Sequence, residues 1–450
     1  MDPRPLVGPY PVTPWMELGV GDTRIPTGQA VWDTARWDTA GDAWAGTEPT
    51  WLDVSCEVNT AVADAGRARI VERFRPGYAD VTVTNTDGWA DLAVPPQAPA
   101  TLSVRPGRPI RWGVDTPTGR HVLFRGFIDD AVPIYQPYGT DVVQLGCIDA
   151  FGEVGRLRLD ELGAPVGAGE SADARIRRLL DAVAWPVIYR DIQPTSISLA
   201  GTTYGTGLTD LLGQAADSAA GSVFADTAGR IVYRARDWQT YAPDVPPDAT
   251  IGNVGPGDVC PSVWELSFRR GDVAGRVRLG RTDGSGVVAV APTPTLIALG
   301  PEPFERSDLL TADDADLAVM AERYVTTRGL DTMPRVESVT LDAASDPGDG
   351  RVVELMATAR PEVPTRIRCR LQARDGRTVF DREMFVTGVA HDIGPTGRWT
   401  CTLTLDVAAP FAAAGGRWDT TGWDRSTWAD VVAALADARR LLARMEGAPS

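Results

Sequence analysis

The 450-residue chain contains two histidines, His121 and His391, and histidine is the side chain best suited to exchange a proton near neutral pH. His391 is followed by Asp392, which resembles a general base beside an orienting acid. Neighbouring residues of a strand point to opposite faces, however, so adjacency alone does not create a catalytic pair. We expect both histidines to be surface or partly packed side chains.

Acidic pairs such as Asp129-Asp130 and Asp313-Asp314 could in principle divide acid and base roles between two carboxyls. A chain with 60 acidic residues forms such pairs by chance. Residues 346–351 resemble a calcium loop, but the acids do not have the required spacing, so we expect a turn. The phosphate-loop, zinc-protease and serine-hydrolase motifs are absent from the sequence. We therefore predict no enzyme and no catalytic, cofactor-binding or metal-ligating residues.

The five cysteines are odd in number, widely spaced and free of any CxxC pair. This pattern does not suit a disulfide framework or a zinc site, and it indicates reduced core residues made in a cytoplasm. They are Cys56, Cys147, Cys260, Cys369 and Cys401.

Tryptophans cluster in two related elements, WDTARWD at residues 32–38 and WDTTGWD at residues 418–424. Each indole offers a large apolar face with one N–H donor. The elements could pin an irregular segment to its own domain, dock onto a neighbouring protein or stack on a sugar. The candidate interaction residues are Trp32, Trp37, Trp44, Trp418, Trp423 and Trp428.

The charge balance limits the possible partners. The chain has 44 basic and 60 acidic residues, a formal charge of −16, and every basic residue is arginine. Such a chain is a poor general binder of nucleic acid or anionic membranes, because like charges repel. The absence of lysine is better explained by GC-rich coding than by a mechanism. The sequence has no 18-residue apolar window and no N-terminal signal pattern, so we expect no membrane span.

Alternating apolar and polar residues predict short antiparallel strands between about 50 and 150, separated by glycine, proline and aspartate turns. Helical spacing then predicts helices over 171–184 and 208–219, followed by a hairpin around 227–229. Thr311 with Asp314 resembles a capping box, which predicts a helix that begins at Thr311 and runs through Leu317, Met320, Ala321 and Tyr324. Strands are expected over 263–268, 275–279, 335–341, 352–357, 366–371, 379–389 and 399–406.

The C-terminal segment 428–446 has apolar residues at spacings of three and four, the register of a coiled coil. Fewer than three heptads are marginal alone, so this helix would require a larger assembly or would pack on its own subunit. The oligomerisation residues expected on it are Val431, Leu435, Ala438, Leu442 and Met445.

Two segments resemble each other across the chain. Residues 124–130 precede a strand that ends at Asp149, and residues 385–392 precede a strand that ends at Asp406. The echo suggests a mainly β fold with α+β insertions, in which antiparallel β-barrel domains are duplicated beside a small α/β domain and a C-terminal helix. The barrels can draw on separate stretches of sequence. We expect an extended arm (1–30), a first barrel with a tryptophan-rich start (31–155), a small α+β domain (156–245), a strand-rich α+β domain (246–330), a second barrel (331–412), and a tryptophan-rich linker with the final helix (413–450).

The order of several weak motifs resembles a known family. These are the element at 32–38, WLDVSC at 51–56, the FRPGYADVTVTNTDG segment at 74–88, the Gly126 and Gly388 elements, and GRWTCTLTL at 397–405. Together they resemble the minor tail proteins of actinobacterial siphophages, and specifically the tail-tip (baseplate) hub family. The resemblance covers most of residues 30–428.

This resemblance implies a structural virion protein with two tube-like barrels, of which three copies form a ring at the distal end of the tail tube. The expected partners are further copies in a homotrimer, the distal tail protein, the tape measure protein and receptor-binding tail proteins. Phage DNA would pass through without specific binding, because an acidic lumen repels phosphates. The expected location is the tail tip of the virion, after assembly in the host cytoplasm. The alternatives are a carbohydrate-binding tail protein and the hub of a contractile injection system.

Overall fold

The computed structural model describes residues 12–20, 49–70, 72–86, 89–90, 104–160, 162, 164–236, 238, 245–255, 257–267, 274–290, 303–329, 335–346 and 350–408. The candidate interaction tryptophans 32, 37, 44, 418, 423 and 428 lie outside these ranges, as do the expected coiled-coil positions 431, 435, 438, 442 and 445. Within the described ranges, every helix is too short or too polar to span a membrane.

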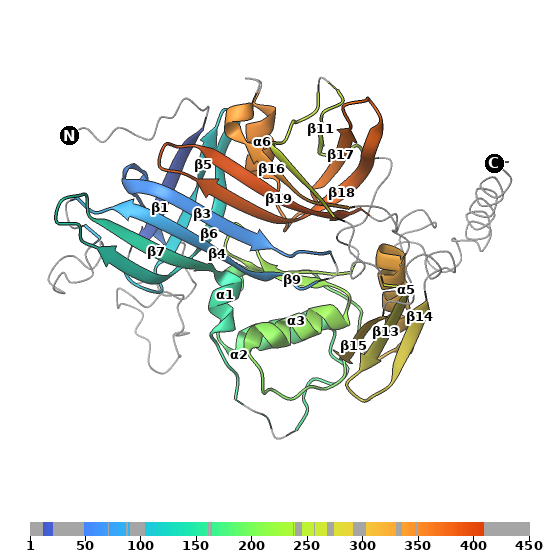
Figure 1. The fold of residues 1–450 in the computed structure, drawn as a ribbon. Helices are drawn as coiled ribbons and strands as arrows, with labels where there is room; N and C mark the ends of the chain where they lie inside the picture. The colour runs from blue at the N-terminus through green and yellow to red at the C-terminus, as the bar shows by residue number, and fades with distance from the viewer. Residues whose placement is uncertain are drawn as a thin grey trace, which may run out of the picture.

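Thirteen strands of the described residues form one large sheet, so the expected mainly β fold is confirmed (Figure 1). We call its first part the N-terminal half-sheet and its second part the C-terminal half-sheet. The N-terminal half-sheet comprises β1 (Thr13–Val20), β2 (Thr50–Asp53), β3 (Val58–Gly66), β4 (Arg75–Thr84), β5 (Pro109–Thr116), β6 (Gly119–Ile134) and β7 (Val142–Asp149). The C-terminal half-sheet comprises β11 (Ala249–Gly252), β12 (Val263–Ser267), β16 (Arg335–Asp342), β17 (Arg366–Gln372), β18 (Thr378–Ile393) and β19 (Trp399–Val407).

Both half-sheets repeat one strand order. The N-terminal half-sheet runs β3-β4-β7-β6-β5, and the C-terminal half-sheet runs β12-β16-β19-β18-β17, with antiparallel pairing at every step. In each, a 16-residue strand (β6 or β18) leads into a strand that ends near a buried aspartate. The repeated order is the structural counterpart of the internal echo in the sequence.

Two smaller units lie below the large sheet in the view of Figure 1. The first joins α1 (Ala150–Gly155), α2 (Ala172–Ala182) and α3 (Leu208–Ser218) with a three-stranded sheet of β8 (Arg190–Ile192), β10 (Ile231–Arg234) and β9 (Ser222–Ala225). The second packs α5 (Asp314–Gly329) on β13 (Arg276–Arg281), β14 (Gly286–Val290) and β15 (Pro303–Leu309). Strands β11 and β12 therefore belong to the large sheet, while β13, β14 and β15 belong to this separate unit.

The prediction of a strand over residues 352–357 is wrong, because these residues lie in α6 (Arg351–Thr358). Gly350 adopts a left-handed conformation with φ of 76° at the helix start. The carboxylate of Asp346 then accepts hydrogen bonds from the backbone N–H groups of Val352 and Val353, at 3.0 and 3.2 Å. This carboxylate satisfies donors that the first helical turn leaves without partners, which outweighs the strand preference of two valines.

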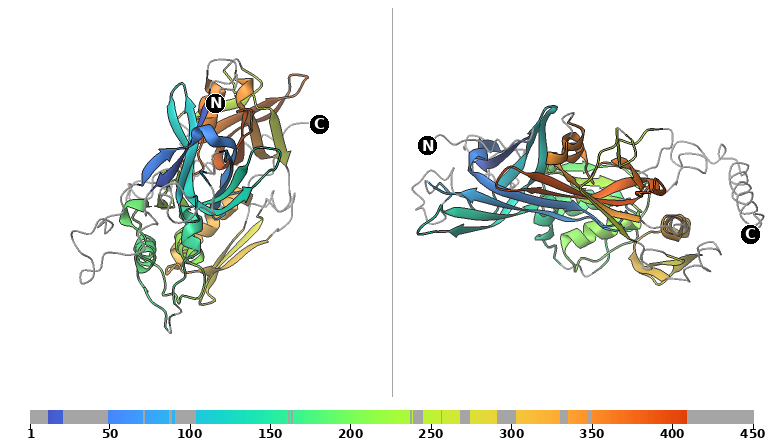
Figure 2. Two further views of the ribbon diagram at one scale, coloured as in Figure 1. Left: turned by 90° about the vertical axis from the view of Figure 1, so that its left-hand side faces the viewer. Right: turned by 45° about the horizontal axis from the view of Figure 1, so that its top comes forward.

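The pairing of β3 with β18 joins the two half-sheets into one continuous hydrogen-bonded sheet (Figure 2). Their register runs from Gly66 opposite Gly388 to Ala61 opposite Ile393. Gly66 has a φ of 120°, and a Cβ atom there would lie 2.5 Å from the Cα atom of Gly388. The close approach of the two backbones therefore requires glycine at position 66.

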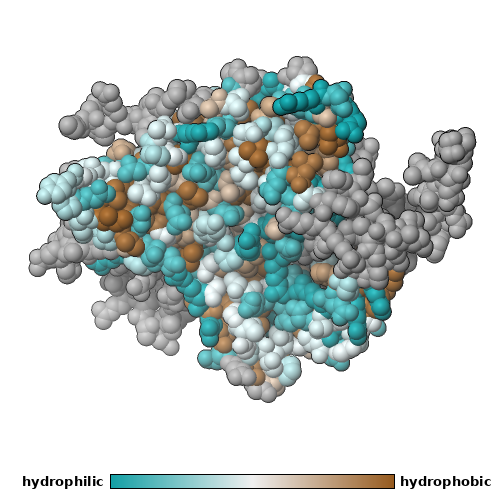
Figure 3. Space-filling view, in the orientation of Figure 1, coloured by the Kyte–Doolittle hydropathy of each residue, from teal (hydrophilic) through white to brown (hydrophobic). Residues whose placement is uncertain are grey.

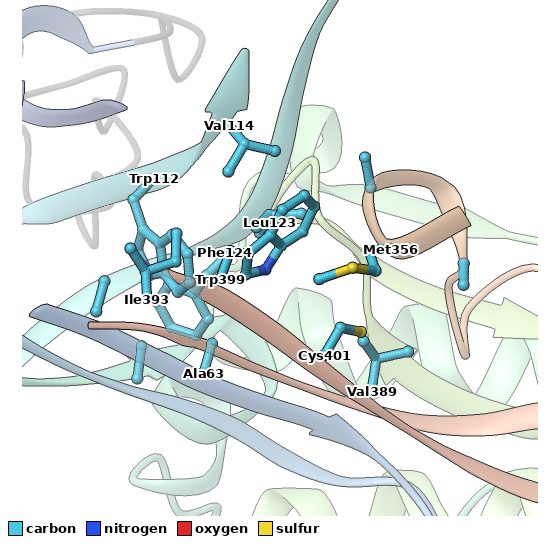
Figure 4. Packing of buried hydrophobic residues seen from close by; sticks show 14 of the residues in the cluster. Ala63, Trp112, Val114, Leu123, Phe124, Met356, Val389, Ile393, Trp399 and Cys401 are labelled. Carbon is cyan, nitrogen blue, oxygen red and sulfur yellow. The ribbon is translucent and has the colours of Figure 1, made fainter. Parts of the chain in front are cut away.

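Side chains from both half-sheets fill a single hydrophobic core. Figure 4 shows Trp112 and Phe124 from the N-terminal half-sheet beside Trp399 and Cys401 from the C-terminal half-sheet, with Met356 of α6 closing one side. The half-sheets have no separate cores among the described residues, so neither would keep its apolar surface from water without the other.

We expect Gly66→Ala to destabilise the fold more than Gly107→Ala. Both glycines have positive φ, but nothing lies within 4 Å of the Cβ position at Gly107, whereas at Gly66 it meets the backbone of β18. The Gly107 variant should cost about 1–2 kcal/mol of unfolding free energy for backbone strain alone. Denaturant unfolding measures both, and equal costs would contradict a tight strand junction.

Candidate functional site

The histidine–aspartate pair of β18 does not form a catalytic site. His391 is buried, whereas Asp392 is exposed, so the two side chains point to opposite faces as expected. The imidazole lies in the shared core, with its ring centroid 6.5 Å from that of Trp112 and 5.9 Å from that of Trp399. Burial, with a smaller contribution from the charge of Arg360, lowers the pKa of His391 to about 3. His391 is more deeply buried than predicted and stays neutral at pH 7.

His121 is partly exposed near the β5–β6 turn and meets hydroxyl groups. Its Nε2 lies 3.1 Å from Oγ1 of Thr116 and 3.3 Å from Oγ1 of Thr118. A carboxylate oxygen of Glu354 on α6 is 3.9 Å away. These contacts link the turn to α6, so a structural role accounts for the contacts that His121 makes.

The acidic pairs and the calcium-like loop also have structural roles. Asp129 pairs with Arg156, and Asp314 lies 2.7 Å from Arg281. Asp313 accepts the N–H of Ala315 at 2.9 Å in the first turn of α5, which also shows that the helix does not begin with Thr311 as its cap. Asp346 caps α6.

Three cysteines are core residues, as predicted, but two are not. Cys147, Cys369 and Cys401 are buried, while Cys56 and Cys260 are exposed. Burial raises the pKa of Cys369 to about 12, so its thiol stays protonated. Among the described residues, no group of three or more histidine, cysteine or acidic side chains is arranged to hold a metal ion.

Charged residues from separate units of the molecule meet at the connection between β3 and β4, residues 67–74, which we call the junction segment. It touches four parts of the molecule. Arg69 forms an ion pair of 2.7 Å with Glu337 on β16 of the C-terminal half-sheet. Arg73 pairs with Asp217 at the end of α3 and lies 3.3 Å from Asp308 on β15.

Arg67 secures the other end of the junction segment. Its guanidinium lies 4.5 Å from the ring centroid of Phe74 and donates to Ser222 Oγ at 3.2 Å. Phe74 in turn meets Phe224 on β9, with ring centroids 4.5 Å apart. Burial lowers the pKa of Arg67 to about 9. A buried cation with a π partner and hydrogen bonds ties the small α/β unit to the large sheet.

The two strand-ending aspartates form hydrogen bonds in and beside the junction segment. Asp149 accepts the backbone N–H of Gly77 at 2.6 Å and that of Gly152 at 2.7 Å. Asp406 accepts the N–H of Ile70 at 2.9 Å. Burial raises the pKa of Asp149 to about 7, opposed by those N–H donors. Asp406 therefore anchors the junction segment itself, whereas Asp149 anchors the start of β4, just after the segment, to the start of α1.

Sequence reasoning identified the two aspartates as an echo but missed the junction segment. Its arginines are spaced irregularly, and their partners come from distant parts of the chain, so no local sequence pattern predicts these contacts. The arrangement connects four structural units through ion pairs, hydrogen bonds and a cation–π contact. The site is therefore suited to holding parts in place, and its charges are used in internal ion pairs.

No family model and no curated protein matches the chain. Solved structures do match its fold. The tail protein from Neisseria meningitidis MC58 aligns with a TM-score of 0.54 at 13% identity, covering 89% of this chain and 99% of that one. The 43 kDa tail protein of prophage MuSo2 from Shewanella oneidensis aligns with a TM-score of 0.51 at 12% identity, covering 88% and 99%. The chain therefore shares the fold of these tail proteins over nearly their whole length.

We expect His391 to contribute a loss of stability between pH 6.5 and pH 5, while Asp149, whose pKa is raised to about 7 in the fold, contributes in the opposite direction. In the unfolded chain the pKa of His391 is near 6.5, whereas in the fold it is about 3, so below pH 6.5 only the unfolded state binds this proton. The loss should reach about 2 kcal/mol at pH 5. In His391→Phe this part of the pH dependence should vanish, while the control His121→Phe should keep it. Denaturant titrations at both pH values decide the matter, and identical slopes for wild type and His391→Phe would contradict it.

Proposed function

We propose that this protein is the structural hub of a phage tail tip, a minor tail protein of a siphophage that infects actinobacteria. The observation that carries the proposal is the alignment of nearly the whole chain with two tail proteins, each covered over 99% of its length. The motif order of residues 30–428 supports the assignment independently of the fold.

Three copies would form a ring at the distal end of the tail tube. Each copy has two half-sheets with the same strand order, so three copies present six related half-sheets. Such an arrangement suits a junction between a six-fold tube and a three-fold tip. Because the two half-sheets share one core, each copy would enter the ring as a rigid block.

The ring would continue the tail channel, with the distal tail protein and receptor-binding tail proteins around it and the tape measure protein inside. The chain carries a formal charge of −16, and three copies carry three times that charge. An acidic channel lets DNA pass without adsorbing, because phosphate groups are repelled by carboxylates. In this proposal the chain is assembled in the host cytoplasm, ends in the virion and has no enzymatic activity.

The proposal predicts that the chain is found at the tail tip. In virions of the encoding phage that carry a C-terminal epitope tag on this chain, antibody-gold label should mark the end of the tail opposite the capsid. Untagged virions treated with the same antibody are the control. Label along the tube or on the capsid would overturn the assignment.

The proposal also predicts that the purified chain associates into trimers. Light scattering over increasing protein concentration should approach three times the chain mass of 48.1 kDa. A different closed number of subunits would contradict the three-copy ring while leaving the tail-tip location to the label.

A further inference from the structure

Strands β3 and β18 pair with each other, and each has a counterpart in the other half-sheet. Among the described residues, the corresponding edges of these counterparts, β12 and β6, have no partner strand. Strand β3 pairs with β4 on one side and with β18 on the other. Its counterpart β12 pairs with β16 alone among the described residues and ends the large sheet. An open strand edge presents backbone donors and acceptors that another strand can satisfy.

The partner of β3 shows the same asymmetry. Strand β18 pairs with β17 through residues 378–385 and with β3 through residues 388–393. Its counterpart β6 pairs with β5 through residues 119–127. Residues 130–134 of β6 pair with β7 only, within the part of the chain that the structure describes. We call the pairing of β3 with β18 the seam. The open edge of β12 is equivalent to the β3 side of this seam, and the open edge of β6 is equivalent to its β18 side.

The ladders fix which residues correspond. Superposing the strand-ending acids Asp149 and Asp406 places Gly146 on Leu403, so their partners Asp130 and Val389 correspond. Two and four residues further on, Val132 corresponds to His391 and Ile134 to Ile393. The same superposition, followed through β4 and β16, matches β3 to β12. It places Ala61 on Val263 and Ala63 on Glu265.

The relation between the halves decides where the partner comes from. If the halves were related by a two-fold axis, β12 would pair with β6 of its own chain, as β3 pairs with β18. Among the described residues, only the pairing of β3 with β18 is made, and β12 does not pair with β6. The two half-sheets are therefore related head-to-tail. If the same relation is applied once more, the strand that lies beside β12 is β6 of another copy, as in the heterologous contacts of a ring.

The side chains on both edges fit such a joint. Val132 on β6 is 48% exposed and Val263 on β12 is 55% exposed. Exposed β-branched residues on open edges favour strand pairing, and aggregation is avoided when another copy covers them. The apolar surface visible in Figure 3 gathers partly over the end of the sheet where β7, the neighbour of β6, lies. Pro133 cannot donate a backbone hydrogen bond, so the joint must rest on its neighbours.

We propose that β12 of one copy pairs antiparallel with residues 130–134 of β6 in the next copy, in the register of β3 on β18. Val263 then lies opposite Ile134 of the neighbour, and Glu265 lies opposite its Val132. The sheet runs unbroken around the ring, with seams inside each copy alternating with seams between copies. This inference rests on the proposed ring and adds the surface that closes it.

Cysteine cross-linking tests the register. In a background with Cys56→Ser and Cys260→Ser, the pair Ile134→Cys and Val263→Cys should be joined between copies by a short thiol-reactive cross-linker, because directly opposed residues lie about 5 Å apart. The mismatched pair Asp130→Cys and Val263→Cys is displaced by about 13 Å along the strand and should stay unlinked. The expected product in assembled virions is a covalent ladder that ends at the trimer.

The cross-linking and labelling results test the edge pairing and the tail-tip hub function separately. Label at the tail tip with no ladder from the matched pair, or an equal ladder from the mismatched pair, overturns the edge pairing and leaves the hub assignment. A virion without the chain at its tip overturns the hub assignment itself.

A second measurement does not depend on virion assembly. Val132→Lys and Val263→Lys place charges on the two edges and should each weaken self-association by about tenfold or more, without lowering the melting temperature. Val379→Lys is the matched control, because Val379 is 48% exposed on β18 but lies on neither edge. Unchanged association in both edge variants would overturn the proposed joint.

Discussion

The antiparallel pairing of β3 with β18 is the contact on which the rest of the molecule depends. It brings together two half-sheets that are far apart in sequence, and it creates the space in which Trp112 and Trp399 are buried. Without this pairing, each half-sheet would expose the apolar face that the other covers, so the hydrophobic effect and the strand ladder reinforce the same arrangement. Gly66 is needed because the two backbones approach too closely for a Cβ atom.

The junction segment has a related role at the boundary of the smaller units. Burying Arg67 and Arg69 is costly unless each guanidinium finds partners, and those partners lie on different units of the molecule. Moving one unit would leave a buried charge without compensation, so the contacts favour one relative placement. In the proposed ring, such a fixed placement would help to hold a channel open.

Local patterns in the sequence predicted much of this architecture. Most strands of the large sheet, the helices α2 and α3 and the β9–β10 hairpin were predicted, because the spacing of apolar residues reports which face of an element is buried. Strand β1 was not, since residues 1–30 were expected to form an extended arm, whereas residues 13–20 pair with β5 and β2. The helix α6 was missed, since its six apolar or small residues are equally compatible with a strand and its cap depends on Asp346 outside the segment. The echo between the halves was detected, but its glycine-based alignment was displaced. The ladders align the halves on Asp149 and Asp406, so Gly126 matches Phe385 instead of Gly388.

The sequence by itself determined the mainly β class, the acidic charge and the lack of recognisable catalytic motifs, because composition and periodicity are properties of neighbouring residues. Only the tertiary structure decided that β3 pairs with β18 and that, within the described residues, one edge of β12 and of residues 130–134 in β6 has no partner strand. It also showed that Arg67, Arg69 and Arg73 connect separate units. The physical reason is that a strand pattern specifies which face is buried but not its partner. Partners are chosen by register, close backbone approach and the filling of a shared core, and these arise only once distant segments meet.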